Sequence, residues 1–168
     1  MSRALRIKIP NSWHHVHVKT RCNEVVFCKI EQCQLILNLL EEASKRFPVN
    51  MIAWNILPSE YHLIIQSLDG DLSIVMKYIN GVLSRRINKQ NGWNGSFMRG
   101  RFRNTIIEKR YVEAAINNIH SIHDENKWPN LEDNKIYASS EGYYTNNCSP
   151  PDWMKKFYKN IKSKNYLL

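Results

Sequence analysis

Two side chains that can bind a divalent metal ion, Glu60 and His62, lie two residues apart in a stretch whose pattern predicts strands. The apolar residues 51–56 precede a Pro58-Ser59 turn, and the two sides of this turn predict a pair of antiparallel strands. Because side chains alternate between the faces of a strand, Glu60 and His62 share one face. A carboxylate and an imidazole at this spacing indicate a metal site on a sheet, which needs at least one further ligand from another element.

Histidines of another predicted strand are candidates for that ligand. Residues 13–20 alternate between apolar and polar side chains, which predicts a strand. His15 and His17 share one of its faces and could face the same groove as His62. Strand histidines more often serve as hydrogen-bonded, half-buried side chains, and that interpretation stays open here beside metal binding.

Length and composition indicate a globular protein with one main domain. The chain has 168 residues, of which 43% are hydrophobic, enough to bury a core without disulfides. Since the sequence shows neither an apolar run long enough to span a bilayer nor a signal-like leader, we expect no membrane partner and a cytoplasmic location. The four cysteines lack Cys-x-x-Cys spacing, which favours reduced thiols and leaves disulfide pairing open.

The charge balance indicates a polyanionic partner. Twenty-four Lys and Arg against fifteen acidic residues give a formal net charge of +9, which favours nucleic acid over a basic surface that serves solubility alone. Arg99, Arg101 and Arg103 alternate with a glycine and an aromatic residue, a pattern that suits phosphate contact and base stacking. The residues that we expect to contact nucleic acid are Arg85, Arg86, Lys89, Trp93, Phe97, Arg99, Arg101, Arg103, Lys109 and Arg110.

Two groups within this set also have structural explanations. Arg85, Arg86 and Lys89 end a predicted helix, where positive charge complements the helix dipole. Trp93 and Phe97 lie in a glycine-punctuated loop, and an aromatic side chain there could fill the core instead of stacking on a base. Both interpretations stay open at this point.

The remaining periodicity predicts the fold. Apolar stripes predict helices over 31–46, 72–89 and 110–123, and a fourth strand follows over 104–108. The order strand, helix, strand, strand, helix, strand, helix predicts an α+β fold, with a ferredoxin-like antiparallel sheet of four to five strands and helices on one face. We assign this domain to residues 1–126.

The C-terminal part differs in composition, and we assign residues 127–168 to a separate segment. Residues 127–151 are rich in Asn, Ser, Tyr and Pro, which predicts an irregular connection. Residues 153–166 alternate lysines with aromatic and aliphatic side chains, which predicts a basic amphipathic tail helix. Such a helix could dock on the domain, on nucleic acid or, with least support, on an anionic membrane surface.

Five stretches of the chain match motifs of one known family in the family's own order. The run Leu-Pro-Ser-Glu-Tyr-His-Leu at 57–63 resembles the signature Met/Leu-Pro-Asn-His-Tyr-His-Leu and differs from it at Ser59 and Glu60. The other matches are Arg3-Ala4-Leu5-Arg6-Ile7 with Trp13-His14-His15-Val16, Arg21-Cys22-Asn23-Glu24 with Phe27, Phe97-Met98-Arg99-Gly100-Arg101-Phe102 with Ile107-Glu108-Lys109, and Asn118-Ile119-His120. Over roughly residues 3–123 the chain therefore resembles the REP-associated tyrosine transposases, single-strand transposases with a His-hydrophobic-His motif.

The resemblance implies a ferredoxin-like fold and a site where two strand histidines and a third-helix residue bind Mg²⁺ or Mn²⁺. A tyrosine of that helix attacks a DNA phosphate. Carried over by position, the second histidine is His62 and the first falls on Glu60, whose carboxylate can still bind Mg²⁺. The tyrosine falls on Asn118 and the helix ligand on Ile122, beside His123. We therefore expect the metal ligands Glu60, His62 and His123, within a degenerate catalytic site marked by Glu60, His62 and Asn118.

These changes favour a protein that binds without cleaving. An amide cannot replace a tyrosine hydroxyl as the nucleophile, and Tyr111 lies two turns before Asn118, roughly 10 Å along a helix axis. The leading hypothesis is an inactive transposase descendant in the bacterial cytoplasm or nucleoid that binds hairpin or single-stranded DNA, or structured RNA, as a dimer like the family. The alternatives are an active metal-dependent nickase with an unusual tyrosine, and a non-catalytic subunit of a larger protein or ribonucleoprotein assembly.

Overall fold

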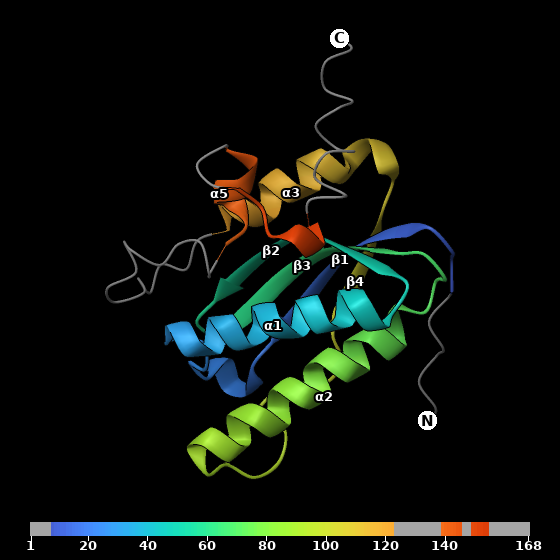
Figure 1. Ribbon diagram of the computed structural model, residues 1–168. Coiled ribbons are helices and arrows are strands. Elements are labelled where there is room, and N and C mark those ends of the chain that lie inside the picture. The colour runs from blue at the N-terminus through green and yellow to red at the C-terminus, as the bar shows by residue number, and fades with distance from the viewer. Residues whose placement is uncertain (1–7, 123–138, 146–148, 155–168) are drawn as a thin grey trace.

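The protein folds as an antiparallel sheet with helices packed on it. The computed structural model describes residues 8–122, 139–145 and 149–154 (Figure 1). Its elements are β1 (Ser12–Lys19), η1 (Arg21–Asn23), α1 (Ile30–Arg46), β2 (Val49–Leu57), β3 (Glu60–Ser67), α2 (Leu72–Asn91), β4 (Arg103–Ile107), η2 (Lys109–Tyr111), α3 (Val112–Ser121) and α5 (Glu141–Tyr144). The prediction of an α+β fold is confirmed, and the predicted strands and helices occur in the predicted order.

The four strands are ordered β2-β3-β1-β4, and each neighbouring pair is antiparallel. β2 and β3 form a hairpin across Pro58 and Ser59, the turn that the sequence predicts. β1 therefore lies between β3 and β4, so side chains of three strands meet on each face around it.

One face of the sheet packs on α1 and α2. Val16, Leu63 and Ile65 point to this face and are at most 1% exposed. They meet apolar side chains of the two helices, including Ile36 and Ile79, in the larger core. The burial of this face is the main stabilising contribution to the fold.

The predicted placement of all helices on one face is wrong for α3, which packs against β2 and β3 on the opposite face (Figure 1). The cause is a β3 strand that is apolar on both sides, because Ile64 points away from the larger core and is fully buried. A second core therefore forms there, in which Ile64 packs with Val112, Ile116 and Ile119 of α3.

Residues after the predicted domain boundary at 126 also pack on the sheet, at the edge strand β2. The ring of Trp54 lies 5.7 Å from that of Tyr143 and 5.6 Å from that of Trp153, measured between centroids. Met154 is fully buried in the larger core. The rest of the predicted tail helix, 155–166, lies outside the described residues.

None of the helices in the described ranges combines the length and the apolar character that crossing a membrane requires.

Gly70 is a position where the fold requires glycine. Its φ is +84°, and an added Cβ would lie 2.8 Å from backbone atoms of Ile9. Gly92 after α2 also has a positive φ, +67°, but an added Cβ would meet nothing within 4 Å.

We expect Gly92→Ala to lower the free energy of unfolding by about 1 kcal/mol through backbone strain, and Gly70→Ala by about 2–3 kcal/mol because a clash adds to the strain. Urea denaturation measures both, and equal losses would contradict the close approach at Gly70.

Candidate metal and nucleic acid site

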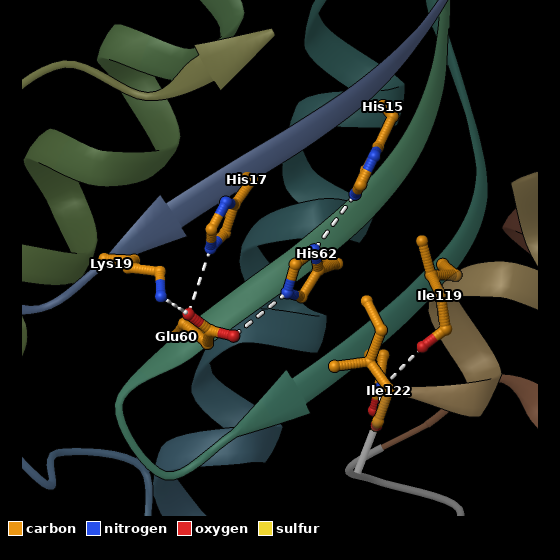
Figure 2. A network of polar contacts seen from close by, with 8 residues as sticks. His15, His17, Lys19, Glu60, His62, Ile119 and Ile122 are labelled. Atoms are coloured by element: carbon orange, nitrogen blue, oxygen red, sulfur yellow. Dashed lines mark hydrogen bonds and ion pairs between the residues drawn. The ribbon is translucent and has the colours of Figure 1, made fainter. Parts of the chain in front are cut away.

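The carboxylate of Glu60 lies at the centre of a polar cluster on the sheet face that α3 partly covers (Figure 2). Lys19 Nζ and His17 Nε2 donate to its Oε2 at 2.8 and 3.0 Å. Its Oε1 lies 3.3 Å from His62 Nε2, and His62 Nδ1 lies 2.9 Å from His15 Nε2. We call these five residues the Glu60 cluster. The predicted common face of Glu60 and His62 is thus observed.

The register between β1 and β3 brings these side chains together. His17 lies opposite His62 and Lys19 opposite Glu60 in the antiparallel pair. Cross-strand neighbours on one face are within contact distance, and the imidazole rings of His17 and His62 stack with centroids 4.3 Å apart. The cluster therefore follows directly from strand pairing.

Three members of the cluster form a possible metal site. One ligand atom each of His17, Glu60 and His62 lies within 4.8 Å of the other two. The predicted pair Glu60 and His62 is present, and His17 supplies the third ligand atom that was expected from His123, which lies outside the described residues. The alternation over 13–20 placed His17 on the correct face, but the pairing of its strand with β3 was needed to identify it as a ligand.

The protonation states of the cluster suit metal binding. Burial lowers the pKa of His62 to about 4, aided by the nearby His17 and opposed by the hydrogen bond to Glu60. Burial raises the pKa of Glu60, but hydrogen bonds from Lys19, His17 and His62 outweigh it and lower this pKa to about 2. At neutral pH His62 is neutral and Glu60 ionised, the forms in which both bind metals. Two imidazoles and one carboxylate suit Mn²⁺ better than Mg²⁺, which prefers oxygen ligands and water.

His15 forms a hydrogen bond with the second ring nitrogen of His62, whichever of the two nitrogens carries the proton. A neutral imidazole has one N–H, so when His62 Nε2 donates to Glu60, its Nδ1 accepts from His15 Nε2. A metal ion bound at His62 Nε2 requires the proton on Nδ1, which then donates to His15. His15 thus occupies the position of the outer partner that orients a metal-binding histidine.

The C-terminal end of α3 is fixed beside this cluster by Asn55. Asn55 pairs with His62 in the sheet and shares its face. Its Nδ2 donates to the carbonyl oxygens of Ile119 at 2.6 Å and Ile122 at 2.9 Å. Ile122, where the motif resemblance predicts a helix ligand, offers only a hydrocarbon side chain. Asn118, where the resemblance predicts the nucleophile, is exposed and lies off the buried stripe of α3.

No described tyrosine belongs to the Glu60 cluster. Tyr111 lies at the N-terminal end of α3, 51% exposed, with the Arg110 guanidinium 4.7 Å from its ring centroid. The hydroxyl of Tyr144 donates to the carbonyl of Ile52 at 2.7 Å, and that of Tyr78 to Glu42 at 2.9 Å. Tyr61 points to the opposite face of the sheet and bonds to Asn80.

The predicted nucleic acid segment lies against the Glu60 cluster. The backbone N–H of Arg99 donates to the carbonyl of Lys19 at 2.9 Å, which fixes the segment to the end of β1. Arg103 begins β4 and pairs with His17. A cavity of about 80 Å³ is formed here, lined by His17, Lys19, Arg99, Gly100, Arg101 and Arg103. The three arginines are exposed.

Phe97 does not suit its predicted role in base stacking. It is 4% exposed and packs edge to face on Phe27 in the larger core, so its faces are not available to a base. Trp93, in contrast, is 42% exposed after α2.

The other predicted contacts lie apart from the cluster. Arg85 of α2 lines a separate cavity of about 510 Å³ together with Arg101, while Arg86 pairs with Glu42 at 3.5 Å and Lys89 is exposed near the end of the helix. Lys109 and Arg110 follow β4, at the end of that strand remote from Arg103.

The chain matches no protein-family model and no curated protein. Among solved structures it is similar to the REP-associated tyrosine transposase bound to a REP hairpin, with 18% identity, a TM-score of 0.56 and coverage of 77% of this chain and 76% of that chain. It is also similar to a candidate transposase from Deinococcus radiodurans R1, with 17% identity, a TM-score of 0.49 and coverage of 73% and 98%. The first similarity shows that the two proteins share a fold, which confirms the fold that the motifs imply.

We expect stability to fall as the pH is lowered from about 6.5 to 4. In this range the unfolded chain protonates His62 while the folded protein does not, because its pKa is about 4, and the slope reaches about 1.4 kcal/mol per pH unit for each such histidine. His120, whose pKa burial also lowers to about 4, adds a loss of the same sign, whereas Glu60 contributes only below its unfolded pKa. Urea denaturation in EDTA measures the slope. His62→Asn should make it shallower, and an unchanged slope would contradict the assignment.

We expect Mn²⁺ to bind at pH 7.5 with a Kd that rises about 10-fold or more in Glu60→Gln, and by about 10-fold in His15→Ala, which removes only the outer partner. Water-proton relaxation measures Mn²⁺ binding directly, and this measurement does not require catalytic activity. Glu41→Gln, an exposed carboxylate on α1, is the control and should leave the Kd unchanged. Equal affinity in Glu60→Gln would place the ion elsewhere.

Proposed function

We propose that this protein is a transposase-derived nucleic-acid-binding protein that recognises hairpin or single-stranded DNA or RNA without cutting it. The observation that carries this proposal is the position of Arg99, Arg101 and Arg103 beside the Glu60 cluster. The arginines lie at the edge of the sheet, next to the face that carries the candidate metal ligands. The same fold occurs in a transposase that is bound to a REP hairpin.

The charges of this surface suit a phosphate backbone. Among the described residues, Arg99, Arg101 and Arg103 take part in none of the ion pairs, so their guanidinium groups are available to phosphate oxygens. Guanidinium groups bind such oxygens through two parallel hydrogen bonds. Phosphate contacts position a nucleic acid without reading its bases, which is consistent with a ligand recognised by its hairpin shape.

The proposed loss of cleavage rests on the residues of α3. A metal ion held by His17, Glu60 and His62 would supply polarisation of a phosphate. Cleavage through a covalent intermediate also needs a hydroxyl nucleophile, and Asn118 offers an exposed amide instead. Ile122 supplies no ligand atom from its side chain. The site thus retains the means to bind a phosphate and lacks the group that attacks it.

A second candidate function, a metal-dependent single-strand nickase, is favoured by one observation. His17 supplies a third ligand atom beside Glu60 and His62, so the number of ligands is not reduced by Ile122. In this case the nucleophile would be a tyrosine at a position other than 118. Incubation of labelled hairpin DNA with Mn²⁺, followed by denaturing gel electrophoresis, separates the two functions, because only the nickase forms a covalent protein–DNA adduct.

We expect the triple variant Arg99→Ala, Arg101→Ala, Arg103→Ala to bind hairpins more weakly and with a smaller dependence on salt. Each lost phosphate contact should reduce the slope of log K against log salt by about 1, hence by about 3 in total. Fluorescence anisotropy with DNA and RNA stem-loops over a range of salt concentrations measures both effects.

A variant with the same change in charge is the control for this experiment. Lys8→Gln, Lys29→Gln and Lys45→Gln together remove three positive charges from exposed positions outside the cavity wall. This control should keep most of the affinity and the slope. Equal losses in the two triple variants would show that the net charge, and not the surface beside the Glu60 cluster, holds the nucleic acid.

A further inference from the structure

We propose that the cavity of about 80 Å³ beside the Glu60 cluster is a pocket for the terminal phosphate of a nucleic acid strand. This inference rests on the proposed function, since it states which part of the nucleic acid enters the protein. It adds two residues, His17 and Lys19, to the arginines already expected to contact phosphates.

The wall of this cavity consists almost entirely of groups that donate hydrogen bonds to anions. It is lined by His17, Lys19, Gly100 and the arginines at 99, 101 and 103. Four of these six residues carry a full positive charge at neutral pH. The larger cavity next to α2 also contains Met76, Met98 and Phe102 in its wall, whereas the small cavity has no apolar side chain. Its lining therefore favours an anion over a base or an apolar ligand.

The positive charge of the wall is only partly balanced. Glu60 bonds to two wall residues, Lys19 and His17, at 2.8 and 3.0 Å, and the same carboxylate is shared with His62. One negative charge thus faces four positive ones, and among the described residues the three arginines form no ion pair. An anion of higher charge is bound more strongly by such a wall.

The size and charge of the cavity suit a single phosphate group. Its volume of about 80 Å³ accommodates several water molecules at roughly 10–15 Å³ each, which is sufficient for one phosphate. An internal phosphodiester carries one negative charge, and the nucleic acid chain continues from it through two ester bonds, so it needs two openings in the wall. A terminal phosphate carries a charge of about −1.5 to −2 at pH 7 and has three free oxygens. It therefore needs one opening and matches the excess positive charge better.

Hydrogen bonds hold the wall in place before a ligand binds. Lys19 is fixed through its side chain to Glu60 and through its carbonyl to the N–H of Arg99. Arg103 is fixed by its pairing with His17. β1, β4 and the segment between α2 and β4 thus bring the backbones of these cationic residues around one point before a ligand binds.

The experiment compares one DNA stem-loop with a short single-stranded extension in three forms, with a 5′-phosphate, a 3′-phosphate or hydroxyls at both ends. Fluorescence anisotropy in EDTA measures their Kd values for the full-length protein without a bridging metal. We expect one phosphorylated form to bind about tenfold more tightly than the hydroxyl form, the weight of one charge-assisted hydrogen bond. Whether the 5′-phosphate or the 3′-phosphate form binds more tightly identifies the strand end that enters the pocket.

Arg103→Gln should remove this preference while the hydroxyl form still binds. Lys45→Gln, on the far end of α1, should retain the preference. Equal Kd values for all three forms of the wild-type complex would overturn the terminal-phosphate pocket and leave the proposed function intact. Failure of all three forms to bind would overturn the proposed function itself.

Discussion

The arrangement of this site depends on the balance around one carboxylate, that of Glu60. Burial alone would favour its neutral form, and hydrogen bonds from Lys19, His17 and His62 reverse that preference. Two of the donors come from β1 and one from β3, so the interaction also links the strands through their side chains. The ionised state of Glu60 therefore depends on the register of the sheet, because a one-residue slip of β1 would turn His17 and Lys19 to the other face.

The same face is built by packing as well as by charge. Ile64 of β3 lies on the face of Glu60 and His62 and requires apolar cover, which α3 provides through Ile116 and Ile119. Asn55 then fixes the last turn of α3 through two carbonyl groups. α3 is therefore held beside the Glu60 cluster, while its buried side chains pack in the second core.

Local patterns predicted most of the fold, and long-range pairing explains what they missed. Strand alternation is sufficient to place Glu60 and His62 on one face, because both lie on the same strand. His17 as a third ligand depends on the pairing of β1 with β3, which no local pattern encodes. The burial of Phe97 has a similar origin, since its partner Phe27 lies seventy residues away in sequence. α3 packs on the opposite face because Ile52, Ala53 and Ile64 form an apolar surface there.

Glutamate at position 60 changes what the site needs from a metal ion. A histidine there would be neutral and would add no charge to the sheet, whereas Glu60 adds a negative charge that must be balanced. Lys19 already balances it at 2.8 Å, so the cluster is electrostatically satisfied by the chain itself. A metal ion must compete with this ammonium group for Oε2, while a phosphate at the neighbouring arginines need not. Under the proposed function, glutamate at this position therefore favours binding of phosphate through the chain's own cations over binding through a metal ion.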